Sequence, residues 1–212
     1  MSESYDQAYV EDGKLILKAE KIGNEYRAGG IESIGKVDFT FGRVEVRARI
    51  PRHPDGAFPA IWLMPQKSAP LYSSWPNGGE IDIMEYYPVN GVPQILGNVA
   101  SGAPGTNNAY WKDKKVPFSH FLEKDPDWAS KFHIWRMDWD RDWIRLYLDD
   151  ELINEVDINQ MQNTGSWSEY NPHRHPHYIL LNLALGGASG GPIDDSAFPM
   201  RYEIDYVRVY QR

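Results

Sequence analysis

"RVEVRARI", residues 43–50, alternates apolar and charged side chains without interruption. Successive side chains of a β-strand point to opposite faces, so the valines, Ala48 and Ile50 would share one face. The arginines and the glutamate would share the other. This pattern predicts a strand that is buried on one face and solvated on the other, which is typical of antiparallel sheets.

Other strand patterns lie on both sides of this segment. They are "KLILKAE" (14–20), "WIRLYLDDELI" (143–153), "YILLNLAL" (178–185) and "RYEIDYVRVY" (201–210). The second of them reads as a hairpin that turns at Asp149 and Asp150. "YILLNLAL" is almost entirely apolar, as expected for a strand covered on both faces. In the last, the alternation slips near Tyr206 and Val207.

Helical patterns are weak along the chain. The best candidate, "FSHFLEKDPDWASKF" (118–132), is interrupted by Pro126 and predicts only a turn or two of helix. No repeat, low-complexity linker or change of composition marks a domain boundary. Short strands among 18 Gly and 15 Pro indicate a β-sandwich or barrel. At this length we expect an all-β sandwich of two antiparallel sheets, a jelly roll, with residues 1–212 as a single domain.

Composition excludes several classes of function. The 212 residues carry a net charge of −8, which argues against nucleic acid or an anionic membrane as a partner. There is no cysteine, hence no disulfide or thiol chemistry. No apolar run approaches the ~18 residues of a membrane span. "MSESYDQAYV" lacks the pattern of an export signal, although a mature or trimmed form would also lack it.

"GGEIDIMEYY" (78–87) places three carboxyl groups in six positions of an otherwise apolar segment. In a regular strand Glu80 and Asp82 share a face, whereas Glu85 points to the other. One extra residue near Ile83 and Met84 would reset the alternation and bring all three acids to one side. We therefore predict a β-bulge at this point.

Neighbouring carboxyl groups raise one another's pKa, so gathering three of them requires a reason. Glycoside hydrolysis requires one carboxyl group that stays protonated near neutral pH and one that stays ionised. A solvated acidic face and a calcium site are the alternatives that this spacing leaves open.

Aromatic residues favour glycoside hydrolysis over the solvated acidic face and the calcium site. Sugars present apolar C–H faces that pack on aromatic rings. Trp75 lies just before the acids, and Trp62 lies in the preceding apolar segment. Asn182, the polar residue of "YILLNLAL", either satisfies a buried partner or meets a sugar hydroxyl. Trp111 and Trp167 either border a cleft or pack on the surface.

"HRHPH" places His173, His175 and His177 at alternate positions, a spacing that also occurs in metal sites. Pro176 and the absence of a partner motif favour a loop that enters the next strand. We expect His133 to have a structural role.

"GEIDIMEYY", together with "GAFPAIWLMP" and "FGRVEVRARIP" before it, resembles glycoside hydrolase family 16. The similarity extends through "FHIWRMDWDRDWIRLYLDDELI", "PHYILLNLALGG" and "YEIDYVRVYQ" and covers nearly the whole chain. The resemblance implies a retaining endo-glycanase without a catalytic cofactor. It assigns Glu80 as the nucleophile, Glu85 as the general acid and base, and Asp82 as the residue that orients Glu80.

The spacing E-x-D-x-x-E resembles the laminarinase, agarase and carrageenase branches of the family. The substrate implied is a β-1,3- or mixed-linkage glucan, with an algal galactan (agar, porphyran or carrageenan) as the alternative. A sulfated galactan would require cations such as Arg27, Arg174 or Arg201 in the cleft. A glycan-binding module without catalysis is the alternative from another class. Trp75, Trp62 and Asn182 are the expected substrate contacts.

The chain departs from the family pattern in two places. Ala100 stands where many relatives have a histidine, and the family's N-terminal strand is missing or shortened. Many relatives hold a structural Ca²⁺, and the matching positions here are Gly13 and Asp205. We further expect a monomer that acts on a polysaccharide, with a secreted, periplasmic or cell-surface location because the substrate is a polymer.

Overall fold

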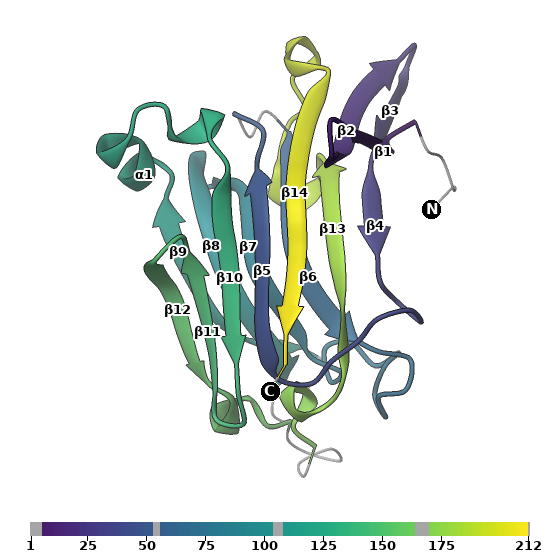
Figure 1. Ribbon diagram of the computed structural model, residues 1–212, viewed down its shortest axis with the longest axis vertical. Helices are drawn as coiled ribbons and strands as arrows, with labels where there is room; N and C mark the ends of the chain where they lie inside the picture. Colours follow the sequence, from purple (N-terminus) through teal and green to yellow (C-terminus); the bar gives the residue numbers. More distant parts are fainter. Residues whose placement is uncertain (1–5, 53–55, 104–107, 164–169, 212) are drawn as a thin grey trace.

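The fold consists of two antiparallel sheets packed face to face (Figure 1). The computed structural model describes residues 6–52, 56–103, 108–163 and 170–211. One sheet lies in front in Figure 1 and the other behind it, with the apolar core between them. The predicted β-sandwich is therefore confirmed.

The front sheet has eight strands among the described residues, in the order β1-β2-β14-β5-β10-β11-β12, with β3 paired to β2. Their bounds are β1 Ala8–Glu11, β2 Lys14–Ile22, β3 Glu25–Ala28, β5 Gly42–Arg49, β10 His133–Trp139, β11 Trp143–Leu148, β12 Glu151–Asp157 and β14 Met200–Tyr210. The alternating segment "RVEVRARI" contributes β5, near the middle of this sheet.

Within the described ranges, the back sheet has six strands in the order β4-β13-β6-β7-β8-β9. Their bounds are β4 Gly30–Glu32, β13 His177–Leu185, β6 Ala57–Pro65, β7 Glu80–Val89, β8 Val92–Gly102 and β9 Ala109–Pro117. Short helices connect the strands: α1 Ser119–Lys124, α2 Gly187–Gly190 and 3₁₀ turns at Trp128–Ser130, Ile158–Met161, Pro172–Arg174 and Asp195–Ala197. The segment 118–132 thus contains one short helix and one turn, as predicted.

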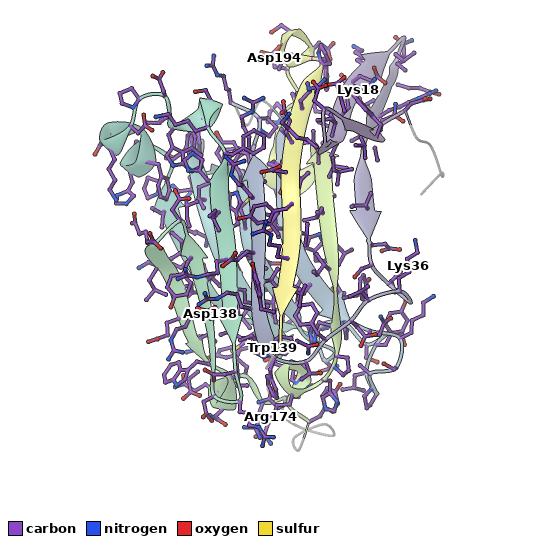
Figure 2. The ribbon with its side chains drawn as sticks, viewed as in Figure 1. Lys18, Lys36, Asp138, Trp139, Arg174 and Asp194 are labelled. Atoms are coloured by element: carbon purple, nitrogen blue, oxygen red, sulfur yellow. The ribbon has the colours of Figure 1, made fainter. Side chains whose placement is uncertain are left out.

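The alternation along β5 sets which side chains enter the core. Val44 and Val46 are fully buried, and their antiparallel neighbours Met137 and Trp135 on β10 are buried with them. The next residues on β10, Asp138 and Trp139, are labelled in Figure 2: Trp139 is buried, whereas Asp138 is bonded to Arg43 on the outer face. Opposite faces of one strand therefore serve the core and the solvent, as the pattern predicts.

Two further local predictions are confirmed. β11 and β12 form a hairpin around Asp149, whose φ of 52° is the left-handed value that such a tight turn needs. The pairing of β14 with β5 shifts between Ile204 and Tyr206, so the slip in alternation is a real irregularity of the strand.

Candidate active site

The acidic segment forms β7, which lies inside the back sheet between β6 and β8. Gly79 precedes it with a φ of +86°, and a Cβ there would lie 2.7 Å from the side chain of Pro172. Only glycine combines this backbone conformation with so close an approach. Gly79 therefore fixes the point at which Glu80 enters the sheet.

The predicted bulge is present in β7. Against β8, the two residues Ile83 and Met84 together oppose the single Gly97, and the pairing against β6 shifts at the same place. Both bulge side chains are buried in the core. Glu85 is thereby returned to the face that carries Glu80 and Asp82, and all three acids line one cleft.

Residues paired across neighbouring strands share a face, so the register arranges the cleft in rows. The rows are Glu80, Ala100 and Trp111; Leu180, Trp62, Asp82, Asn98 and Asp113; and Asn182, Ala60, Glu85, Leu96 and Lys115. Most of these residues line a cleft of about 510 Å³ on the outer face of the back sheet, together with Phe58, Tyr87 and Ser189. The sheet therefore presents acids at its centre and aromatic side chains around them.

Glu80 is held by two donors. Trp75 donates its indole N–H to Oε2 at 2.6 Å, and Asp82 provides a second side-chain hydrogen bond. The pKa of Glu80 is raised overall: burial raises it, and the hydrogen bonds from Trp75 and Asp82 oppose that rise. The ionised carboxylate of Glu80 is the form that both bonds stabilise.

Asp82 is only 1 % exposed, and its pKa is raised well above the usual value. Burial is the main cause, followed by the charges of Glu85 and Glu80. A protonated Asp82 is a donor, so the proton that it keeps is the one that bonds to Glu80. This hydrogen bond favours the ionised form of Glu80.

Glu85 has a pKa raised to about 7, because burial and the charge of Glu80 disfavour its ionised form. Asn98 opposes these effects by donating from Nδ2 to Oε2 at 2.5 Å. The two carboxyl groups thus differ: hydrogen bonds favour the ionised form of Glu80, whereas Glu85 is protonated below about pH 7. That is the pair of protonation states needed by a nucleophile and a general acid.

The predicted substrate contacts lie at this cleft. Trp62 and Asn182 both line it, and the indole of Trp62 donates to Oδ1 of Asn182 at 2.7 Å. Trp75 is 51 % exposed and reaches the cleft through its bond to Glu80. Trp111 also lines the cleft, whereas Trp167 lies outside the described residues.

Several cleft residues were not predicted from the sequence: Asn98, Phe58, Tyr87, Asp113 and Lys115. The rings of Phe58 and Tyr87 meet edge to face at 4.9 Å. Burial, aided by the charge of Glu85, raises the pKa of Tyr87 to about 12. The alternation along β7 places Tyr87 on the face of Glu85 once the bulge is included, and this signal was available in the sequence.

The arginines considered for a sulfated substrate are engaged elsewhere. Their bonding partners are Glu25 for Arg27, Asn159 for Arg174 and Glu11 for Arg201. None of the three lines the cleft as the described residues define it. The cation found there is Lys115, which forms an ion pair of 2.7 Å with Asp113.

The histidines of "HRHPH" precede and begin β13, as expected. His173 and His177 are buried, and burial lowers their pKa values to about 3 and about 4. Across the described ranges no cluster of three or more His, Cys, Asp or Glu side chains is arranged to hold a metal ion. His133 is buried between Asp149 and the carbonyl of Trp128.

The residues predicted for calcium lie on the front sheet. Gly13 is in the turn between β1 and β2, and Asp205 is in β14. The carboxylate of Asp205 accepts a hydrogen bond of 2.6 Å from Arg47. A calcium ion needs six to eight oxygen ligands, and a guanidinium occupies the carboxylate that would be one of them. The calcium site at Gly13 and Asp205 therefore stays a prediction, and Arg47 is the partner of Asp205 that the structure shows.

Known proteins resemble this chain in sequence and in structure. A beta-glucanase of Rhodothermus marinus is 32 % identical over 97 % of this chain and 71 % of the relative. The laminarinase structure from the same organism aligns with a TM-score of 0.78 at 31 % identity, covering 98 % of this chain and 81 % of that one. A structure from work on endo-acting O-glycanases of the human gut microbiota gives a TM-score of 0.82 at 29 % identity, covering 99 % and 78 %.

Other relatives are longer, and the chain spans only 31 % and 40 % of the length of two of them.

No helix within the described part of the chain is both long and apolar enough to cross a membrane. The family model described as "Glycosyl hydrolases family 16" matches residues 1–208, which include β7 and the three acids. Because this match covers nearly the whole chain, the chain belongs to glycosyl hydrolases family 16.

Proposed function

We propose that the protein is a retaining endo-hydrolase of β-1,3- or mixed-linkage β-glucans. The observation that carries this proposal is the bulge of β7, which places Glu80 and Glu85 together on the cleft face of the strand. The cleft is open and crosses several strands, which suits the interior of a polymer rather than a chain end. The named beta-glucanase and laminarinase relatives support the choice of glucan.

In the first step Glu80 attacks the anomeric carbon and forms a glycosyl–enzyme ester. The glycosidic C–O bond breaks, and its oxygen takes the proton of Glu85. In the second step Glu85, now ionised, accepts a proton from water while the water oxygen attacks the same carbon. Glu80 leaves as a carboxylate, and two displacements restore the original anomeric configuration.

The aromatic side chains supply the binding surface. Trp62 is fixed by its bond to Asn182, so its ring is presented to the cleft in one orientation. Trp75 is held in the same way by Glu80. Rigid aromatic faces favour the C–H surfaces of sugars at little cost in side-chain entropy.

The test of this function compares the wild type with Glu80→Gln on laminarin, mixed-linkage glucan, agarose, porphyran, carrageenan and mucin O-glycans. We expect oligosaccharides from the two glucans with the wild type and none with the variant. NMR of the first products should show the β-anomer. Cleavage of a galactan or O-glycan instead would overturn the proposed substrate, and binding without cleavage would support a glycan-binding module.

The predicted location and assembly are part of the same proposal. A polysaccharide is too large to be taken up intact, so the enzyme would act outside the cytoplasm, as a secreted, periplasmic or cell-surface protein. The described residues of one chain contain both carboxyl groups and the aromatic contacts, which supports a monomer as the active unit.

We expect calcium chelation to leave the melting temperature unchanged, because the Arg47 guanidinium already neutralises Asp205. An occupied site at 100 times its dissociation constant would add about 2.7 kcal/mol of stability. For a chain of this size that corresponds to a shift of roughly 5 °C or more. Thermal unfolding in EDTA and in calcium chloride measures the difference, and a drop of that size in EDTA would show that the predicted calcium site is occupied.

A further inference from the structure

Asn98 contacts two of the three acids at once. It lies on β8 directly across from Asp82 and is 4 % exposed. Its Nδ2 donates to Oε2 of Glu85 at 2.5 Å, and its side chain also hydrogen-bonds to Asp82. An amide nitrogen has two N–H donors, which is the number required to hold two carboxyl groups.

The bulge explains how one side chain reaches both acids. Two residues of β7 are accommodated opposite Gly97. Such a bulge bends its strand and re-aims the side chains beside it. The partner of Glu85 in the ladder is Leu96, yet the polar contact of Glu85 is with Asn98, one row away. The extra residue therefore turns Glu85 toward β8 as well as toward the cleft.

We propose that Asn98 is the positioning residue for the acid/base carboxyl group: its amide fixes the orientation of Glu85 and stabilises its ionised form. This inference rests on the proposed hydrolase function of the same site. Many members of the family have a histidine at the position of Ala100. Ala100 instead pairs with Glu80, so the polar contact across to β8 is made by Asn98.

The surroundings of Glu85 show why a neutral donor is needed. The titratable and charged groups that share its cleft are Glu80, Asp82 and Tyr87 on β7, and Asp113 and Lys115 on β9. The residues in its row on β6 and β13, Ala60 and Asn182, do not titrate. Lys115 is paired with Asp113, so its charge is largely compensated. The Asn98 amide is left as the close donor that opposes burial and the charge of Glu80.

The test follows the pH dependence of kcat/KM in the wild type and in Asn98→Ala. The basic limb reports the acid group of the free enzyme and should lie near pH 7 in the wild type. Loss of a hydrogen bond to the ionised form raises the pKa of Glu85, so the limb should move upward by about one pH unit. At pH 6, kcat/KM should fall roughly 10-fold because the acid is less well oriented.

Asn154→Ala is the matched control. Asn154 donates to the carbonyls of Gly97 and Lys112, so it supports the same region of β8 without touching an acid. It should lower the melting temperature and leave the basic limb in place. Asn98→Thr retains one donor and should recover part of the shift. A basic limb that stays within about 0.2 pH units of the wild type in Asn98→Ala would overturn the inference.

A second measurement does not depend on activity. Carboxyl-labelled glutamate gives a ¹³C resonance for Glu85, identified by its absence in Glu85→Gln. We expect its titration midpoint to rise in Asn98→Ala and to stay in place in Asn154→Ala. If the wild type cleaves none of the glycans, the proposed function fails while this titration still decides the role of Asn98. An unmoved midpoint in an active enzyme would reject the positioning role alone.

Discussion

Replacing Glu80 by alanine is expected to abolish cleavage of the polymer, because the variant lacks the carboxylate that forms the covalent intermediate in the proposed mechanism. Replacing Glu85 by alanine should reduce cleavage by about 10²–10⁴-fold, the usual contribution of a general acid. The two carboxyl groups differ in environment: Glu80 accepts from Trp75, and Glu85 has a pKa of about 7. Loss of Glu80 should therefore remove the covalent step, whereas loss of Glu85 should remove only the proton transfer.

Sodium azide with an aryl glycoside distinguishes the two roles. The aryl group leaves without an acid, so Glu85→Ala still forms the glycosyl–enzyme ester on Glu80. Azide enters the space of the missing carboxyl group and attacks from the β face, giving a β-glycosyl azide. In Glu80→Ala azide occupies the place of the nucleophile and gives the α-glycosyl azide. ¹H NMR of the products separates the anomers.

Glu155→Ala provides the control for removing a carboxylate. Glu155 is on β12 and is bonded to Arg145, away from the cleft. Its activity should be close to that of the wild type, with no product from azide. Exchange of the two anomers between Glu80→Ala and Glu85→Ala would reverse the assigned roles.

The elements that could be predicted from the sequence are those whose signal is local. The alternation of residues 43–50 determines which side chains of β5 face the core, and the misplaced Glu85 reveals the bulge. Both follow from the two-residue period of a strand. β9 was not predicted, because its sequence "AYWKDKKVP" is an edge strand with no apolar face. It nevertheless provides Trp111 and Lys115 to the cleft.

The contacts between distant segments could not be predicted in this way. Asn98 reaches Glu85 across a strand pair, and Trp62 reaches Asn182 over 120 positions of sequence. Arg47 and Asp205 are 158 positions apart. Such pairs depend on strand order and register, and these are set by the packing of the whole sandwich rather than by any one segment. The placement of the three acids on one face could therefore be predicted from the sequence. The residues that contact them from other strands could not.

A change in the number of residues between Asp82 and Glu85 should have an effect as large as the loss of Glu85. An alanine inserted after Met84 adds one more step, which turns Glu85 toward the core. We expect cleavage to fall by about 10²–10⁴-fold, as in Glu85→Ala. The free energy of unfolding should also fall, because an unpaired carboxyl group is buried. Urea denaturation and the glucan assay measure the two effects.

Deletion of Ile83 is the matched variant, because it also changes the length of β7 by one residue. Without the bulge the strand reads E-x-D-x-E, and simple alternation keeps all three acids on the cleft face. The deletion removes a buried side chain and should cost about 2–5 kcal/mol of stability. It should nevertheless retain measurable cleavage, since Glu85 still pairs opposite Leu96.

Equal activity of the two variants would show that the phase of the strand is not what places the acid. Activity in the deletion alone would establish that the bulge adjusts the position of Glu85 on a face that alternation can also provide.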